Sequence, residues 1–232
     1  MEFELTEEQQ MIQDMCRRFA EKEIKPVAAQ LDETKEHPAD LCRQMGELGL
    51  MGIAIPDTYG GAGMDYVSYI VALIEISKGC ASTGVIMSVN NSLYCFPVNR
   101  FGTDAQKEKY LAPVASGKAV GCYALTEAGA GSDPASMRTT ATLDGDSWVI
   151  SGEKKFITNG NVADYCVVAA VTDREKGPKG ISSFVLDTRN TPGFSVGRVE
   201  DKLGIKASGT AELVFSRPVF PKTPSWAKKA RG

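Results

Sequence analysis

The chain has 232 residues, of which 43% are hydrophobic and 24% are charged, and this composition is typical of a globular protein and excludes a disordered or fibrous one. The formal net charge of −3 gives no broad basic surface, so we expect no nucleic-acid partner. No stretch reaches the roughly 18 apolar residues of a membrane helix, and the N-terminus lacks a secretory or transit signal, so we expect a cytoplasmic protein without a membrane partner.

The first part of the chain, residues 1–118, is predicted to form an N-terminal helical domain. Thr6-Glu7-Glu8-Gln9 is a capping box, because the Thr hydroxyl and the Gln side chain satisfy opposing free backbone amides. Apolar residues at helical spacing then predict a helix to about Leu31. The same criteria predict further helices over 38–48, 65–78 and 81–96, and from a second capping box at Thr103–Gln106 to near Gly117.

The cysteine and histidine content argues against two common kinds of site. The six cysteines are scattered without a Cys-x-x-Cys pair, so we predict reduced thiols and no metal site. The single histidine, His37, precedes Pro38 in a predicted turn between helices, where a passive role is expected. Chemistry of the Ser-His-Asp kind is therefore disfavoured.

After Gly117 the hydrophobic period changes, and residues 119–215 are predicted to form a small β-barrel or sandwich domain. Short strands separated by Gly-, Asp- and Pro-bearing turns are expected over 120–125, 137–143, 147–151, 165–171, 181–186 and 211–215. The predicted fold class is therefore α+β and multidomain, with an all-helical domain followed by a β domain.

The glycine-bearing stretch Tyr123–Asp133 is the most informative part of the β half. Its Gly-x-Gly resembles a Rossmann turn, but a Rossmann loop must open a helix, and the β-branched residues from Met137 to Leu143 predict a strand instead. Two interpretations remain from the residues alone. The stretch is a plain turn between strands, or its glycine amides and the hydroxyls of Thr126 and Ser132 bind a phosphate.

A second motif, Lys155-Phe156-Ile157-Thr158-Asn159-Gly160, places an aromatic ring and a hydroxyl at a strand end. The Asn-Gly pair is a hairpin signal, and a ring with a neighbouring hydroxyl also suits a flat heteroaromatic ligand. Together with the helical half and the segment Asp201–Lys206, the two motifs resemble the acyl-CoA dehydrogenase family, nearest its short-chain (butyryl-CoA) branch. The resemblance runs from about residue 3 to Phe215.

The resemblance implies FAD as cofactor and assigns cofactor-binding positions to Tyr123, Leu125, Thr126, Gly131, Ser132, Phe156, Ile157 and Thr158. It implies that the Thr126 hydroxyl bonds the flavin pyrimidine edge and that Thr158 bonds near N5. Phe156 would cover the ring, and Ser132 would contact the pyrophosphate and the CoA part of the substrate. Ala128 stands where the family usually has proline, a change that removes a rigid φ and no ligand.

The activity implied by the resemblance is α,β-dehydrogenation of a short-chain acyl-CoA, with an electron-transfer flavoprotein as acceptor and a homotetrameric assembly. The family's glutamate base lies in a C-terminal helical domain, and we expect that domain to be absent from this chain. No catalytic residue is therefore assigned, and Glu127 is not expected to act as the base. We expect the chain alone to be inactive.

Residues 216–232 hold five basic and no acidic residues and depart from the family pattern. One hypothesis is a frameshift, because a neighbouring reading frame of Pro218–Gly232 is compatible with a family-like linker. Two alternative functions stay open: an acyl-CoA oxidase or monooxygenase on the same fold, and a non-catalytic interaction fragment that uses the basic tail.

Overall fold

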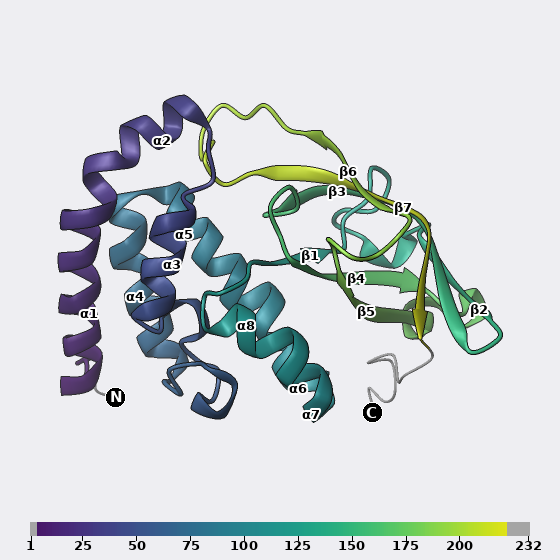
Figure 1. Cartoon of the computed structure of the whole chain (residues 1–232), viewed down its shortest axis with the longest axis horizontal. Helices are drawn as coiled ribbons and strands as arrows, with labels where there is room; N and C mark the ends of the chain where they lie inside the picture. Colours follow the sequence, from purple (N-terminus) through teal and green to yellow (C-terminus); the bar gives the residue numbers. More distant parts are fainter. Residues whose placement is uncertain (1–3, 222–232) are drawn as a thin grey trace. The chain divides into compact units, whose positions relative to one another are not determined.

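The computed structural model describes residues 4–221, which form two compact units. The helical unit contains the described residues up to Ala119 together with Asp201–Gly209, and the β unit contains Val120–Glu200 and the chain from Thr210 onward. Figure 1 shows the helices and strands with the labels used below. Within residues 4–221, no helix has both the length and the apolar character needed to cross a membrane.

The first helix of the helical unit begins at the predicted capping box. The Thr6 hydroxyl accepts a hydrogen bond from the Gln9 amide at 3.2 Å, and the Gln9 side chain accepts one from the Thr6 amide at 3.1 Å. Helix α1 (Glu7–Phe19) continues through a π-helical turn over 20–24 and a 3-10 turn over 25–27 into α2 (Ala28–Thr34). The change of winding coincides with Pro26, which has no amide hydrogen to donate.

The remaining helices agree with the predicted positions, and the second capping box, Thr103 with Gln106, is also confirmed. Gly49 ends one predicted helix with a φ of 74°, a conformation that favours glycine. The helix expected over 81–96 instead runs to Phe101, as an α-helix, a π-helical segment over 89–95 and a second α-helix. The helices are α3 (Ala39–Glu47), α4 (Tyr66–Gly79), α5 (Ala81–Ser88), α6 (Phe96–Phe101), α7 (Asp104–Gln106) and α8 (Ala112–Ala115).

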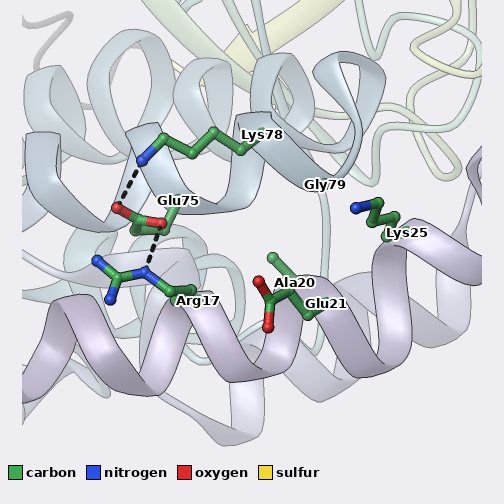
Figure 2. A pocket seen from close by; sticks show the side chains of 7 residues that line it. All are labelled: Arg17, Ala20, Glu21, Lys25, Glu75, Lys78 and Gly79. Carbon is green, nitrogen blue, oxygen red and sulfur yellow. Dashed lines mark hydrogen bonds and ion pairs between the residues drawn. The ribbon is translucent and has the colours of Figure 1, made fainter.

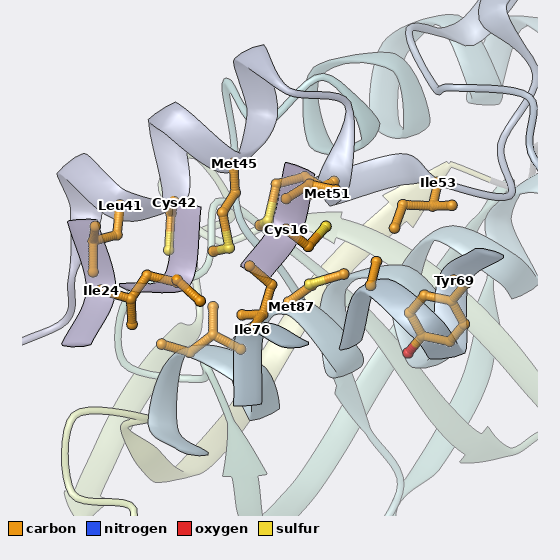
Figure 3. Close-up of a cluster of buried hydrophobic side chains, with 14 of the residues drawn as sticks. Cys16, Ile24, Leu41, Cys42, Met45, Met51, Ile53, Tyr69, Ile76 and Met87 are labelled. Atoms are coloured by element: carbon orange, nitrogen blue, oxygen red, sulfur yellow. The ribbon is translucent and has the colours of Figure 1, made fainter. Parts of the chain in front are cut away.

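The core of the helical unit is rich in sulfur (Figure 3). Methionine fills irregular gaps because its side chain is unbranched and flexible. Burial, and to a lesser degree the charge of Glu75, raises the pKa of the Cys16 thiol to about 12, so this thiol packs as a small neutral side chain. All six cysteines lie within the described residues and are free thiols. The core side chains labelled in Figure 3 include Cys16, Cys42, Met45, Met51, Ile76 and Met87.

The β unit is one seven-stranded mixed sheet that curls on itself, in the order β1-β4-β2-β3-β7-β6, with β5 also paired to β4. A helical region followed by a small β domain is the predicted class, and it is confirmed. The pairs β1/β4 and β2/β4 are parallel, and the other pairs are antiparallel. The strands are β1 (Gly121–Ala124), β2 (Thr140–Asp144), β3 (Ser147–Thr158), β4 (Tyr165–Val171), β5 (Ile181–Asp187), β6 (Phe194–Val199) and β7 (Thr210–Pro221).

Several strands differ from the sequence prediction: β2 begins at Thr140 instead of Met137, and β3 continues to Thr158 instead of ending at Ser151. Strand β6 was not predicted, because it is an edge strand with mostly exposed side chains and a glycine at 197, and so lacks a clear apolar alternation. Strand β7 was expected to end at Phe215 but continues to Pro221 beside β3, with Phe220 paired to Trp148. Buried Phe220 packs against Phe184 at a centroid distance of 5.7 Å. Residues 216–221 of the expected basic tail are therefore strand, and the rest of that tail lies outside the described residues.

The segment Asp201–Gly209 was expected to belong to the β domain, but it groups with the helical unit. Two ion pairs connect it there. The Lys35 ammonium lies 2.7 Å from an Asp201 carboxylate oxygen, and the Lys206 ammonium lies 3.2 Å from one of Asp32. Both partners lie in or directly after α2, so the two ion pairs connect this segment to the end of that helix.

Candidate functional site

The glycine-bearing loop interrupts one row of the sheet. β1 and then β2 lie along the same edge of β4. The chain therefore leaves this edge of β4 after Thr126 and returns to it at Thr139. The Val171 amide donates to the Thr139 carbonyl at 2.9 Å on one side of the row. On the other side, the Lys155 amide of β3 donates to the Thr126 carbonyl at 2.8 Å. The two motifs predicted from the sequence are therefore directly hydrogen-bonded to each other.

The tip of the loop is open to solvent. Gly129, Gly131 and Ser132 are exposed, and a methyl group added to either glycine would meet no atom within 4 Å. Ser136 lies across the loop, where its hydroxyl donates to the Asp133 carbonyl at 2.8 Å. The space beside the glycine amides is consistent with close approach of an anionic group such as a phosphate.

Three predicted hydroxyls have no protein partner within residues 4–221. The hydroxyls of Thr126, Ser132 and Thr158 make no hydrogen bond to any described residue, and these residues are half-buried or exposed. By contrast, the Thr172 hydroxyl, directly after β4, is bonded to the Ser182 hydroxyl at 2.8 Å. Uncommitted donors on two adjacent segments fit a polar cofactor such as FAD.

An irregularity in β3 exposes the predicted aromatic ring. The pairing with β7 shifts register between Lys154 and Ile157, and Phe156 within it has a φ of 58°, a costly conformation for a bulky residue. Strict alternation from Ile150 would bury Phe156. The bulge instead leaves Phe156 61% exposed and turns Ile157 into the core at 2%. Phe156 thus presents its ring to solvent, whereas the Ile157 side chain packs against protein.

The other two predicted positions precede Thr126 on the chain. Tyr123 is half-buried on β1, and burial raises the pKa of its hydroxyl, so it remains protonated at neutral pH. Leu125 is also half-buried, and it packs against the small cluster of Ala130, Met137, Ala169 and Val171 beneath the loop. Leu125 adjoins Thr126 and Tyr123 lies three residues before it, which places both at the incoming end of the loop.

Lys154 is a site residue that the sequence analysis missed. Its side chain is fully buried, and its ammonium lies 2.8 Å from Glu127 Oε1 and 2.9 Å from the Leu125 carbonyl. The signal was present in the alternation of β3, because Lys154 shares a face with buried Ile150. A lysine at an inward position of a strand requires a buried anion, and Glu127 is that anion.

The environment of Glu127 supports the expectation that it is not the base. Burial alone would raise the pKa of its carboxyl, but hydrogen bonds from Lys154, from Thr139 and from the Arg138 amide outweigh burial and lower the pKa to about 2. A carboxylate with so low a pKa is a weak proton acceptor near neutral pH. Glu127 therefore has a structural environment rather than a catalytic one.

The helical unit has a separate polar cavity of about 260 Å³ between α1 and α4 (Figure 2). Buried Glu75 lies in its wall and is hydrogen-bonded to Arg17 at 3.4 Å and to Lys78 at 2.9 Å. These ion pairs neutralise the Glu75 carboxylate within the protein. In the part of the chain that the structure describes, no group of three or more His, Cys, Asp or Glu side chains is arranged to hold a metal ion.

Comparison with known proteins identifies the two parts of the chain. Residues 6–118 match the family model "Acyl-CoA dehydrogenase, N-terminal domain", and residues 122–217 match "Acyl-CoA dehydrogenase, middle domain". The short-chain specific acyl-CoA dehydrogenase of Clostridium acetobutylicum is 50% identical over 232 residues, which are 100% of this chain and 61% of the relative. The chain thus spans less than two thirds of that relative's length.

Solved structures give the same result. Butyryl-CoA dehydrogenase from Megasphaera elsdenii superposes with a TM-score of 0.91 at 39% identity, over 96% of this chain and 59% of that one. A glutaryl-CoA dehydrogenase from Mycobacterium smegmatis, solved in complex with FADH2, superposes with a TM-score of 0.89 at 37% identity, over 96% and 56% of the two chains. Two consecutive parts of this chain match two domain models of one family, and members of that family match 96–100% of the chain, so the chain belongs to the acyl-CoA dehydrogenase family.

Proposed function

We propose that this chain supplies the flavin-binding surface of a short-chain acyl-CoA dehydrogenase. Three hydroxyls that lack a described protein partner, on two segments joined by the bond from Lys155 to Thr126, are the observation that supports FAD binding most directly. The relatives' names, short-chain specific and butyryl-CoA dehydrogenase, support a short-chain acyl-CoA as substrate.

The residues of the site would each contact a different part of the ligand. Gly131 and Ser132 at the exposed loop tip would bind the pyrophosphate, and Ser132 would also contact the CoA part of the substrate. Thr126 and Thr158 would bond the flavin ring edge, and exposed Phe156 would pack on its face. The Tyr123 and Leu125 side chains would line the same region, whereas buried Ile157 has only its main chain to offer. FAD, when bound, supplies the hydride acceptor for the α,β-dehydrogenation.

Proton removal from the substrate needs a carboxylate base that these residues do not supply. Glu127 is ion-paired with Lys154 and has a pKa of about 2. The proposal therefore assigns binding and orientation to this chain's described residues, and it leaves the base to the remainder of a full-length family member.

A titration with FAD tests the proposal. The purified chain is expected to bind FAD weakly, and replacing Thr126, Ser132 and Thr158 together by alanine is expected to weaken binding further by about 10- to 1000-fold, since each neutral hydrogen bond contributes about 0.5–1.5 kcal/mol. The matched control is T142A/S195A, which removes two exposed hydroxyls on β2 and β6. Equal FAD affinity in the triple variant and the control would contradict the proposal.

The alternative enzyme, an oxidase or monooxygenase, differs in the electron acceptor. We propose an electron-transfer flavoprotein as the acceptor, and comparing its reduction with peroxide formation by a full-length form separates the two. The interaction-fragment alternative predicts binding that depends on Lys228, Lys229 and Arg231, which lie outside the described residues. Homotetrameric assembly and a cytoplasmic location stay predictions.

A further inference from the structure

The base of the glycine-bearing loop contains an ion pair that lies within the protein. Lys154 reaches up from β3, and its ammonium has three donor hydrogens. Its three neighbours are the Leu125 carbonyl at 2.9 Å, Glu127 Oε1 at 2.8 Å and the Met137 sulfur at 3.7 Å. Leu125 and Glu127 lie on the incoming arm of the loop, after β1, and Met137 lies on the outgoing arm, before β2. Lys154 therefore bridges both arms of the loop and has no donor left for a ligand.

Glu127 closes the loop from the opposite side. Its Oε2 accepts from the Arg138 amide at 2.6 Å, and its Oε1 accepts from the Thr139 amide at 3.0 Å. The Glu127 backbone also exchanges two hydrogen bonds with Ala130, at 3.0 and 3.2 Å. One side chain thus satisfies the two amides at which the chain returns to the sheet, eleven and twelve residues later.

Between its two ends the loop is held by local hydrogen bonds: the Ser136 hydroxyl donates to the Asp133 carbonyl at 2.8 Å and to the Gly129 carbonyl at 3.4 Å, and a short 3-10 turn runs over 134–136. Ala130 and Met137 are buried in the cluster with Ala169 and Val171, but Ala128, Gly129 and residues 131–136 are exposed. A loop with two glycines at its tip has high conformational freedom, so fixing its two ends decides how well the tip is ordered.

We infer that the Glu127–Lys154 pair is a positioning device that clamps the base of the loop, so that the tip around Gly131 and Ser132 is preorganised for a diphosphate ligand. This inference rests on the proposed function. The opposite charges of the pair cancel, and Lys154 is fully buried, so the pair acts through loop geometry and not by attracting the ligand. Preorganisation strengthens binding because the ordering cost is met before the ligand arrives.

Amide hydrogen exchange of the whole chain tests the clamp without any cofactor. In K154M, exchange over residues 127–138 is expected to be faster by about ten-fold or more, and the rest of the β unit is also expected to exchange faster, because the Glu127 carboxylate is left buried and unpaired. The double variant E127Q/K154M removes both charges together, so it avoids an unpaired buried carboxylate. It is expected to fold and to show the same local loosening. FAD affinity is expected to fall about ten-fold in both variants as the loop loses order.

The matched control is E75Q, because Glu75 is a buried, ion-paired carboxylate in the helical unit (Figure 2). It should leave exchange over 127–138 and FAD affinity unchanged. Unchanged exchange of the loop in the double variant would overturn the inference, and so would uniform acceleration across the whole β unit in that variant, which indicates a purely stabilising pair. If the unaltered chain does not bind FAD, the proposed function fails, and loop exchange still decides whether the clamp exists.

Discussion

Two buried carboxylates, one in each unit, are neutralised in different ways. Glu75 is paired with two partly exposed cations, since the side chains of Arg17 and Lys78 are 45% and 62% exposed. Glu127 meets Lys154, which has no exposed surface. The Arg17–Glu75 pair joins α1 to its neighbour α4, two helices that also pack through their apolar faces, and the Lys78–Glu75 pair lies within α4. The Glu127 pair instead holds two ends of a loop that has few apolar contacts.

The difference shows where a sequence can tolerate the loss of a charge. If Glu75 is removed, its cations remain hydrated, because they already reach water. If either member of the Glu127–Lys154 pair is removed, the other is left buried without its counter-charge. A fully buried pair is therefore costly to break even where it adds little net stability compared with an apolar replacement.

The largest expected effect is on Lys154. K154M leaves the Glu127 carboxylate buried and unpaired, so we expect the β unit to lose about 3–5 kcal/mol of unfolding free energy. Urea unfolding followed by Trp148 fluorescence measures this loss. The double variant E127Q/K154M should recover part of the lost unfolding free energy. If K154M lost no more unfolding free energy than E75Q, the distinction between the two carboxylates would be wrong.

The second effect is a dependence on acid. The pKa of Glu127 is lowered from 4.5 to about 2 in the folded chain, so its stabilising contribution is complete above pH 4.5 and disappears as the pH falls toward 2. Lys154 stays charged across this range and adds no slope. We expect the unfolding free energy to fall less steeply with acid in E127Q than in the unaltered chain. Parallel acid titrations of the two proteins, monitored by circular dichroism, provide the comparison; identical slopes would contradict it.

A smaller effect is expected at Glu75. E75Q keeps a polar side chain at the site and returns Arg17 and Lys78 to water, so we expect a loss of about 1–2 kcal/mol from the helical unit. Hydrogen exchange of α1 and α4 measures it, with the β unit of the same sample as the internal control. A loss that spreads to the β unit would show that the two carboxylates are not independent.

The smallest effect concerns Phe156. Its φ of 58° is strained for phenylalanine and easy for glycine, and its exposed ring contributes little to the core. F156G is therefore expected to raise the unfolding free energy by about 0.5–1 kcal/mol while weakening FAD binding. Thermal unfolding and FAD titration measure the two changes, and F156W, which keeps an aromatic face, is the control for binding. A fall in both stability and affinity would mean that the ring packs in the protein core.

Much of the helical unit follows from local sequence. The Thr6 and Thr103 capping boxes and Gly49 act through residues no more than four positions away, so a single pass along the chain finds them. The strands β4 and β5 were likewise visible as apolar runs between turns. Edge strand β6 was missed because its side chains are exposed, and an exposed strand does not need an apolar pattern.

At the candidate site, the sequence by itself determined which hydroxyls, glycines and aromatic ring are available, through two short motifs. Only the tertiary structure decided which of these side chains face solvent and what holds them. The bulge in β3 exposes Phe156 and buries Ile157 against the simple alternation. Lys154 and Glu127 lie 27 positions apart, and they meet because the sheet places β3 beside the loop. Burial and long-range pairing arise from packing of the whole sheet, so no local pattern contains them.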